Sequence, residues 1–467
     1  MTNPPTDSKE NSAIIPRAEH NVSRKLISEN AIKVLRRLNR YGFTAYLAGG
    51  GVRDIVLGRE PKDFDIVTSA TPEEIKKIFR NALLIGRRFR IAHIRFHNEL
   101  IEVSTFRALQ KNEEPEKSEL EGLALTEEEG DADMDPSIDE TGRRRKMPVE
   151  GRLQSEDGLI LRDNVWGSPE EDAYRRDFTV NALFYNMEDF SIIDHVGGMK
   201  DLLQGRLKLI GEPGLRYRED PVRMLRAVRF AAKLGFIIER DSLEPITELK
   251  EEILKSNSSR LYEELQKLWI SDEAEKGYQL MRSTGLFATL FPEVDEWLGT
   301  EDDAYPHTFL GSAFQWIEEE IRDGRKISPA LLFAVIMSGP IIKKAKELQE
   351  ETGAKFPVIF PVVKSLITVA RERISIPKRD TESIKAILYG EQRFPQTRGK
   401  RPYAWLRNPG FTDAFRFFRM KKSIEGGDKE LIEWWEKFMK TNQGEIAPPR
   451  KKRPPRKRGK RAYKKPA

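Results

Sequence analysis

Hydrophobic residues in the first hundred positions recur at helical and strand spacings in turn. A helix is expected from about residue 29, because the apolar positions there lie three and four apart: Ala31, Val34, Leu35 and Leu38. Short apolar runs at 44–48 and 64–67 predict buried strands. The segment between them, 52–57, predicts a helix that ends at Gly58.

The next segment begins with a strong helix signal. Thr71-Pro72-Glu73-Glu74 combines a capping box with proline at the first helical position, which predicts a helix to about Phe79. Two more apolar stretches, 92–97 and 100–105, follow and predict a hairpin. Strand and helix alternate before these paired strands, so we expect a small mixed sheet with helices on one side.

This pattern breaks between residues 108 and 157. Residues 113–140 contain thirteen acidic residues and one lysine. Such a composition cannot bury apolar surface, so we expect an inserted surface loop. Apolar patterning resumes near Gly158 and is mainly helical from about Asp201. The expected fold class is therefore α+β, with a small mixed-sheet head domain followed by an all-helical body.

These changes in pattern divide the chain into five expected segments. They are a flexible N-terminus (1–28), a head domain with the acidic insertion 108–157 (29–200), a helical neck (201–270), a helical body (271–447) and a basic, disordered tail (448–467).

Composition narrows the class of protein. The 467 residues are 38% hydrophobic and 33% charged, which suits several domains with ordinary cores. There is no cysteine, which excludes a disulfide framework and a thiolate metal site. We find no apolar run of about 18 residues and no signal-peptide core in 1–28, so we expect no transmembrane segment and a cytoplasmic protein.

The positive charge is concentrated at one end. The net charge is +6, but residues 448–467 hold eleven Lys or Arg and no acid, and the rest of the chain carries −5. Basic blocks of this kind bind nucleic acids or simply keep a chain soluble.

Two short motifs suggest phosphate chemistry. The run Gly49-Gly50-Gly51 lets the backbone approach a polyphosphate without a Cβ in the way, and Arg53 could clamp a phosphate through two hydrogen bonds. Asp63 and Asp65 are spaced to share one face of a strand and to hold two divalent metals about 4 Å apart. A glycine run alone is often a tight turn, and Asp-x-Asp alone is often a solvated strand end. Together they favour nucleotidyl transfer.

Three further features extend this hypothesis. Glu102 lies on a neighbouring strand, either as a third carboxylate or facing solvent. Asp177 and Asn181 are spaced to share a helix face beside Arg176, or to form a charged helix cap. Asp220 comes one turn before a basic stripe that could read a base edge or be a solvated face, and the stripe consists of Arg223, Arg226 and Arg229.

In their order and spacing, four motifs resemble the class II tRNA nucleotidyltransferase/poly(A) polymerase family of the DNA polymerase beta superfamily. They are 48–54, Asp63-Phe64-Asp65, Arg176-Asp177-Phe178-Thr179-Val180-Asn181-Ala182 and 219–223. The resemblance covers about residues 30–290. Within the family, the segments most similar to bacterial poly(A) polymerases are 84–94, 398–402, 408–411 and the basic tail. The long acidic insertion after Arg107 departs from the usual shorter loop.

The resemblance implies a role for each motif. Asp63 and Asp65 would bind two Mg²⁺ ions, and Asp177 would support the catalytic geometry. The neck would recognise the base of ATP, and the body would bind RNA. The residues implied to bind the nucleotide are Gly50, Arg53, Arg176, Asp220, Arg223, Arg226 and Arg229.

The activity implied is template-independent addition of AMP from ATP to RNA 3′ ends. RNA 3′ ends and ATP are then the expected partners, RNA-decay proteins are candidate partners, and we expect a monomer. A CCA-adding enzyme that acts on tRNA would use the same site and stays open. A non-catalytic RNA-binding protein also stays open, although the intact carboxylates argue against it.

Overall fold

The computed structural model describes residues 13–86, 90–109, 152–154, 160–163, 165–302, 305–306, 308–354 and 358–442. The chain divides into two compact units, Met1–Ser256 and Asn257–Ala467. Most of the acidic insertion, the basic tail and residues 87–89 of the poly(A) polymerase-like segment lie outside the described residues. The helices expected to form one neck, 201–270, fall on both sides of the division at Ser256.

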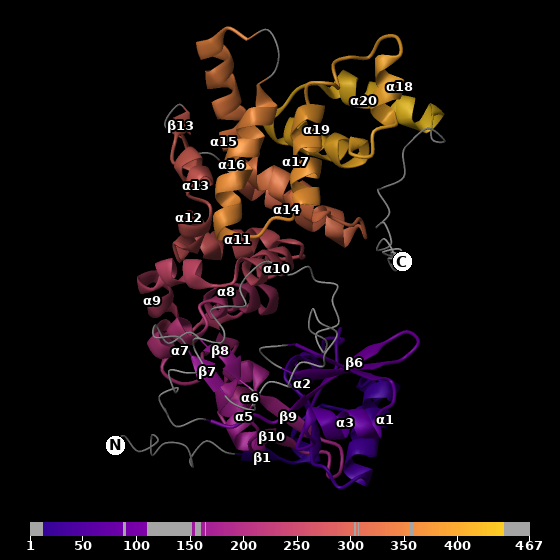
Figure 1. Ribbon diagram of the computed structural model, residues 1–467, viewed down its shortest axis with the longest axis vertical. Coiled ribbons are helices and arrows are strands. Elements are labelled where there is room, and N and C mark those ends of the chain that lie inside the picture. Colours follow the sequence, from indigo (N-terminus) through magenta and orange to yellow (C-terminus); the bar gives the residue numbers. More distant parts are fainter. Residues whose placement is uncertain are drawn as a thin grey trace, which may run out of the picture. The chain divides into compact units, whose positions relative to one another are not determined.

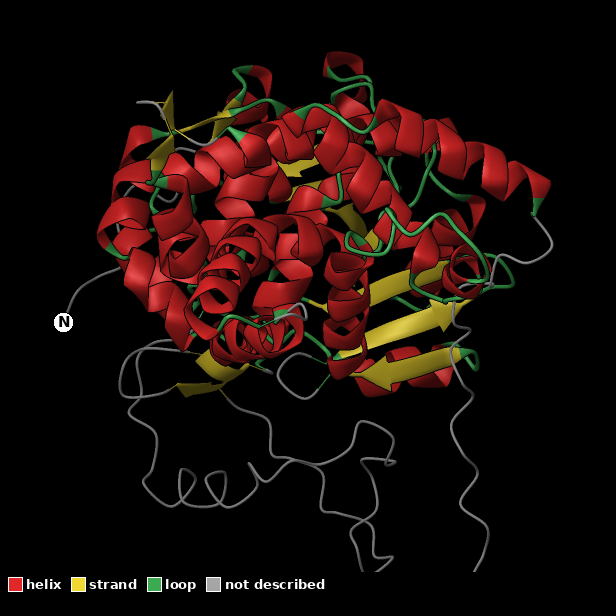
Figure 2. Ribbon diagram, turned by 90° about the horizontal axis from the view of Figure 1, so that it is seen from above, coloured by secondary structure: helices red, strands yellow, loops and turns green. Residues whose placement is uncertain are grey.

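The first unit is built on an eight-stranded mixed sheet in the order β1-β10-β9-β2-β3-β6-β5-β4, seen as the strands at the indigo-to-magenta end of Figure 1 and in yellow in Figure 2. Only β3 and β6 pair in parallel within this sheet, and its other neighbours are antiparallel. The strands are β1 (Ala13–Ile15), β2 (Ala45–Ala48), β3 (Asp65–Thr68), β4 (Ala82–Ile85), β5 (Ile91–Arg95), β6 (Leu100–Thr105), β9 (Leu183–Asn186) and β10 (Ile192–Asp194).

Local sequence explains the helices that pack on this sheet. Ser28 caps α1 (Glu29–Arg40) by accepting from the N–H of Asn30, and the four predicted apolar positions of α1 are all buried. The capping box at Thr71 begins α3 (Pro72–Ile78), as expected. α1 packs against β2 and β3, and α3 against β4 and β5.

The other helices of this unit are α2 (Gly50–Val56), α5 (Pro169–Arg175), α6 (Gly198–Leu203), α7 (Pro213–Glu219), α8 (Val222–Leu234) and α9 (Arg240–Glu248). The 3₁₀ turns among the described residues of this unit are Arg17–Glu19, Arg24–Leu26, Thr179–Asn181 and Lys250–Lys255. Two small ribbons lie outside the main sheet, formed by β7 (Arg152–Gln154) with β8 (Ile160–Asp163) and by β11 (Arg206–Leu207) with β12 (Ile237–Ile238).

The sheet is larger than the sequence pattern predicts. β4 has no predicted counterpart, and it pairs with β5 at one end of the strand order. β1 falls inside the segment expected to be flexible, yet it pairs with β10 at the other end. Both are short edge strands of three or four residues, so local periodicity carries little signal for them. β1 pairs with a strand far along the chain, whereas β4 pairs with β5, the next strand in sequence.

Where the structure describes it, the second unit is helical except for the two-residue strands β13 (Glu301–Asp302) and β14 (Tyr305–Pro306). Its helices are α10 (Ser258–Trp269), α11 (Ala274–Ser283), α12 (Leu286–Leu290), α13 (Pro292–Leu298), α14 (Phe309–Arg322), α15 (Pro329–Thr352), α16 (Ile359–Arg373), α17 (Lys378–Gly390), α18 (Arg401–Leu406), α19 (Phe411–Glu425) and α20 (Lys429–Thr441). The fold class expected from the sequence is confirmed. No helix in the described ranges has both the length and the apolar character needed to cross a membrane.

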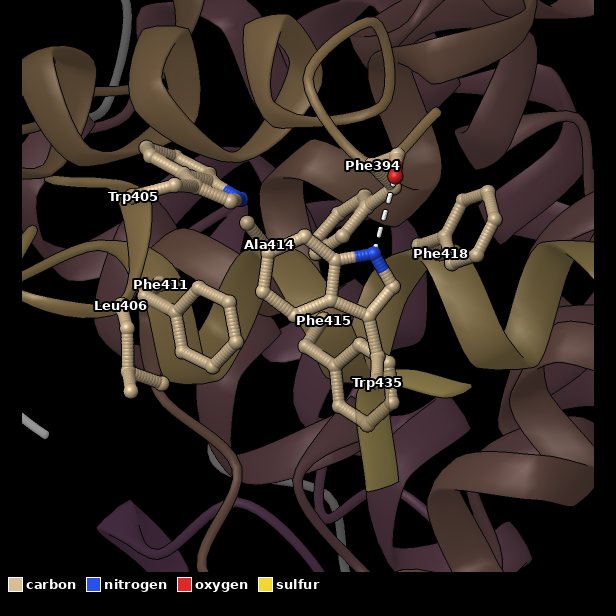
Figure 3. Packing of buried hydrophobic residues seen from close by; sticks show 8 residues of the cluster. All are labelled: Phe394, Trp405, Leu406, Phe411, Ala414, Phe415, Phe418 and Trp435. Atoms are coloured by element: carbon tan, nitrogen blue, oxygen red, sulfur yellow. Dashed lines mark hydrogen bonds between the residues drawn. The ribbon is translucent and has the colours of Figure 1, made fainter. Parts of the chain in front are cut away.

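An aromatic cluster forms the core of the C-terminal helices (Figure 3). Phe394 lies at its centre, stacked on Phe418 with ring centroids 4.6 Å apart. The indole N–H of Trp435 donates to the carbonyl oxygen of Phe394 at 2.9 Å, so a fully buried tryptophan has its polar atom satisfied.

Candidate active site

The glycine run forms the turn between β2 and α2. Gly49 has φ 65° and ψ −124°, a conformation that only glycine adopts readily. A Cβ at this position would lie 3.0 Å from Nη1 of Arg176 and 3.3 Å from the carbonyl oxygen of Asn181. The turn therefore brings two motifs together, 49–53 and 176–181, that are far apart in the sequence.

Asp65 is the first residue of β3, whereas Asp63 precedes the strand. The β2–β3 ladder ends where Ala48 pairs with Asp65, because the next residue on β2 is Gly49, where the chain turns away. The expected strand 64–67 is therefore displaced by one residue, and strand alternation does not orient Asp63. Both aspartates are exposed residues at the same edge of the sheet.

Glu102 lies beside Asp65, because the parallel β3–β6 ladder pairs these two residues directly. Paired residues on neighbouring strands point to the same face, so the two carboxylates lie close together. On the far side of Glu102, Oε1 lies 3.2 Å from Nε2 of His93 on β5. The structure therefore places Glu102 on the Asp65 face of the sheet.

The pKa of Asp65 reflects this crowding of negative charge. Although part of its side chain is exposed, the protein packed around it limits hydration and raises the pKa to about 6. The negative charges of Glu102 and Asp63 raise this pKa too, and Arg176 opposes them. A cation bound here would relieve the repulsion.

The donor atoms fit a hard divalent metal. In the ranges that the structure describes, no group of three or more His, Asp or Glu side chains is arranged to hold a metal by itself. A metal at Asp63 and Asp65 would therefore take its other ligands from water or substrate. This is the usual situation of Mg²⁺, which commonly binds one or two carboxylates together with phosphate oxygens.

Arg176 follows α5 and faces the glycine turn. Nε and Nη2 donate to Oδ2 of Asp172 at 3.2 and 3.1 Å, and Nη1 donates to the carbonyl oxygen of Asn181 at 3.1 Å. Its guanidinium also lies 5.1 Å above the ring of Phe184. These contacts hold a positive charge close enough to oppose the rise in the pKa of Asp65.

Asp177 and Asn181 meet as expected, but not on a regular helix. α5 ends at Arg175, and a 3₁₀ turn, Thr179–Asn181, brings Nδ2 of Asn181 to 3.1 Å from Oδ1 of Asp177. Arg226 donates to the other oxygen, with Nε at 2.7 Å. Burial alone would raise the pKa of Asp177, but Arg226, Asn181 and the N–H of Phe178 together lower it well below its usual range.

Arg53 is buried rather than presented to a ligand. Only 3% of it is exposed. Its Nη1 donates to Oδ1 of Asn181 at 2.6 Å, and Nε and Nη2 both lie against Oδ1 of Asp54. In this arrangement the guanidinium connects α2 to the Asn181 turn, and contact with a phosphate would require these bonds to open.

The predicted arginine stripe on α8 does not form one wall. Arg223 is buried and donates to the carbonyl oxygen of Arg216 at 2.7 Å and to Glu219 at 3.1 Å. Arg226 and Arg229 lie over the ring of Phe230, at 5.3 and 4.3 Å from its centroid. Three-residue spacing turns each side chain by a further 60° around the helix, so Arg223 meets other neighbours than Arg226 and Arg229 do.

Two residues near the site were not singled out from the sequence. Phe230 is the aromatic centre that Arg226 and Arg229 share with Arg53, which lies 5.3 Å from the same ring. Arg216 donates to the carbonyl oxygens of Arg175 and Arg176 at 2.7 and 2.8 Å. Phe230 could have been found from the sequence, because it lies directly after Arg229 and one turn after Arg226. Arg216 has no such local signal, because its contacts form only in the tertiary structure.

Asp220 caps the C-terminus of α7 and lies two residues before the first residue of α8. Its N–H donates to the carbonyl oxygen of Arg216 at 3.3 Å, and its own carbonyl oxygen accepts from the N–H of Arg223 at 3.0 Å. The turn at Asp220 therefore positions the start of α8. Gly50 begins α2 beside the guanidinium of Arg53.

Three family models match the chain. They are a poly A polymerase head domain over residues 45–208, a probable RNA and SrmB-binding site of polymerase A over 235–298, and a polymerase A arginine-rich C-terminus over 355–466. The chain is 39% identical to poly(A) polymerase I of Salmonella typhimurium over 94% of its own length and 87% of that protein.

Similarity to CCA-adding enzymes is more limited in sequence. The chain is 32% identical to the CCA-adding enzyme of Lactobacillus gasseri, over 55% of its own length and 54% of that protein. The fold resembles the crystal structure of the Bacillus stearothermophilus CCA-adding enzyme in complex with CTP, with a TM-score of 0.53 and 22% identity over 89% of this chain and 82% of the other.

Proposed function

Since the chain belongs to the bacterial poly(A) polymerase family, we propose that it adds AMP from ATP to RNA 3′ ends by metal-assisted nucleotidyl transfer without a template. The observation that carries the proposal is the position of Asp65. It lies at the start of β3, beside the glycine turn and opposite Glu102, with a pKa raised to about 6. Such a site attracts a cation and lies next to backbone that a phosphate can approach.

In this proposal Asp63 and Asp65 hold two Mg²⁺ ions. When bound, the ions would supply charge stabilisation at the phosphoryl oxygens and would activate the 3′-hydroxyl of the RNA. Phosphoryl transfer needs little covalent chemistry from the protein, so the remaining residues act by positioning and by electrostatics.

Different residues position the substrates and supply the charges. Gly49 and Gly50 keep the backbone of the turn open to the triphosphate, and Arg176 supplies the positive charge that faces it. Asp177 fixes Arg226 and Asn181, and through Asn181 it fixes Arg53. Asp177 and Arg53 are thus positioning residues in this arrangement, and a direct contact between Arg53 and a phosphate would require a rearrangement.

Recognition of the base is assigned to α8 and the turn before it. Asp220 and Arg223 are the residues proposed to read ATP, with Arg226 and Arg229 beside them. Arg223 is held in place by Glu219 and by the carbonyl oxygen of Arg216, which supports a fixed donor geometry. A fixed donor can discriminate between base edges, because a wrong base leaves it unpaired.

Adenylate addition is favoured over CCA addition by the extent of the similarity. The relative named poly(A) polymerase I matches over 94% of this chain, whereas the CCA-adding relative matches over 55%. We propose that the enzyme processes RNA 3′ ends, including those of mRNA, in the cytoplasm, which suits a chain without cysteine. We further propose that it acts as a monomer.

The test compares nucleotides and primers. Purified protein is incubated with Mg²⁺ and a generic RNA, with ATP alone or CTP alone, and in parallel with a tRNA that lacks its CCA end. We expect long ladders with ATP on generic RNA and little extension with CTP. Addition limited to C, C and A on the tRNA would instead establish the CCA-adding alternative.

A further inference from the structure

A groove in the second unit has no part in the site described above. It lies among α16, α17 and the segment around α18, and its volume is about 510 Å³. Its lining combines aromatic side chains with cationic ones, including Phe360, Lys364, Tyr389, Arg393 and Trp405. Among the described residues that line it, Glu382 alone is acidic.

The aromatic part of the groove includes a ring that is exposed to solvent. Phe360 packs against Tyr389 with ring centroids 4.5 Å apart, yet 43% of Phe360 is exposed to solvent. Arg393 is held between Tyr389 and Trp405, at 4.9 and 5.4 Å from their ring centroids. A large apolar ring that is fixed in place and left open to solvent is suited to stacking against a planar ligand.

Hydrogen-bond donors in the groove lack acceptors among the described residues. Trp405 is 3% exposed and also belongs to the aromatic core (Figure 3), but its indole N–H has no hydrogen-bond partner. The Nε of Arg393 is likewise buried without one. The side-chain oxygen of Asn408 accepts from the N–H of Gly410 at 2.8 Å, which directs the amide so that its NH₂ remains to donate.

The charge of the groove favours an anionic ligand. Glu382 is paired with Lys385 at 2.7 Å, so the lone acid of the lining is neutralised. Lys364 and Arg393 then leave a net positive lining. Stacking rings, unpaired donors and cations together match the bases and phosphates of a nucleic acid strand better than they match a peptide.

We propose that this groove binds single-stranded RNA, with a base stacked on Phe360 and the adjoining phosphates held by Lys364. The proposal rests on the function proposed above and adds to it a holding site for the RNA on the second unit, separate from the residues that transfer AMP. The amide NH₂ of Asn408 can donate to the ring nitrogens and carbonyl oxygens of bases. The site therefore tolerates different sequences, including an adenylate tract.

The test measures binding without catalysis. Fluorescence anisotropy of a labelled oligo(A) is followed with the full-length protein, without ATP, over a range of salt concentrations. The variants are Phe360→Ala, which removes the ring, Phe360→Trp, which keeps a stacking surface, and Lys364→Ala. Lys344→Ala is the matched control, because Lys344 is an exposed lysine on α15 that does not line the groove.

We expect Phe360→Ala to raise the Kd for oligo(A) by about 5- to 150-fold, the range for loss of one base stack, and Phe360→Trp to restore binding. Lys364→Ala should lower the slope of log Kd against log salt by about 0.7, the value for one phosphate contact to a single strand. Lys344→Ala should leave both quantities unchanged.

Oligo(A) binding by Phe360→Ala within about twofold of the wild-type Kd would overturn the proposal, as would equal salt slopes for Lys364→Ala and Lys344→Ala. If Phe360→Ala melts at a lower temperature, its weaker binding could reflect a loss of folding. The proposal is then judged on the other two variants: Phe360→Trp should bind oligo(A) like the wild type, and Lys364→Ala should have the smaller salt slope. AMP transfer by the wild-type protein and by Lys344→Ala tests the proposed function separately, because neither protein alters the groove. If the wild type extends RNA but Phe360→Ala binds RNA with the wild-type Kd, the RNA-binding role of the groove is refuted and the proposed function is not.

Discussion

Asp65 is the residue on which the proposed chemistry depends. We expect Asp65→Asn to lower AMP transfer by more than about a hundredfold, since even indirect partners of a metal ligand are worth 10–100-fold. Mg²⁺ should raise the melting temperature of the wild type and not that of the variant, because the ion binds the folded carboxylates. Glu188→Gln, an exposed carboxylate elsewhere in the first unit, is the control. Retained transfer in Asp65→Asn would make the metal assignment untenable.

The second residue-scale prediction concerns the ion pair between Asp177 and Arg226. Asp177→Asn keeps the shape and removes the charge, and we expect a loss of about 2–4 kcal/mol in the free energy of unfolding at pH 7. The folded pKa of Asp177 lies below its ordinary value of 3.8, so its stabilisation is complete above about pH 4 and is lost as the pH falls further.

Urea denaturation between pH 2.5 and 7 measures this effect for wild type, Asp177→Asn, Arg226→Gln and the double variant. The wild type should lose stability towards low pH more steeply than Asp177→Asn. Additive effects of the two single substitutions would contradict a coupled pair.

At the scale of elements, the turn into α2 depends on Gly49, because other residues do not readily adopt its backbone conformation. Gly49→Ala places a Cβ 3.0 Å from Arg176 and forces an unfavourable φ, so we expect a loss of about 2–3 kcal/mol and impaired AMP transfer. Gly58→Ala, just past the other end of α2, has φ 69° and no neighbour within 4 Å. It should cost only about 1–2 kcal/mol. An equal loss of unfolding free energy in both variants would mean that the contact with Arg176 does not contribute to the cost of Gly49→Ala.

The same elements indicate how far local sequence predicts structure. The capping box at Thr71 and the buried face of α1 form as expected, because each depends on residues within one or two turns. β3 begins one residue later than expected, because its start is set by where β2 turns away at Gly49. β1 was missed because it depends on an edge offered by the distant strand β10. β4 was missed although it pairs with the next strand along the chain, because four residues give too short a pattern.

At the scale of the whole molecule, the basic tail is predicted to strengthen RNA binding. Deleting residues 448–467 removes eleven positive charges. We expect weaker RNA binding and a slope of log Kd against log salt that falls by about 0.7 for each phosphate the tail contacts. Transfer of AMP to a short primer should change little.

A tail of the same length with glutamine in place of each Lys and Arg serves as the control, and it should behave like the deletion. Equal salt slopes for the intact and truncated proteins would count against an RNA-binding tail and leave solubility as its role.

The sequence by itself determined the family and indicated the proposed chemistry. The glycine run, Asp63 and Asp65, and Arg176 through Asn181 are identifiable because each motif is short and its residue types are those that phosphate and metal binding would require. The tertiary structure decided which side chains meet. It set Glu102 opposite Asp65, turned Arg53 inward to Asn181, and divided the arginines of α8 between Glu219, Asp177 and Phe230. Those contacts join residues up to 128 positions apart, and no local pattern encodes the distance or direction between such residues.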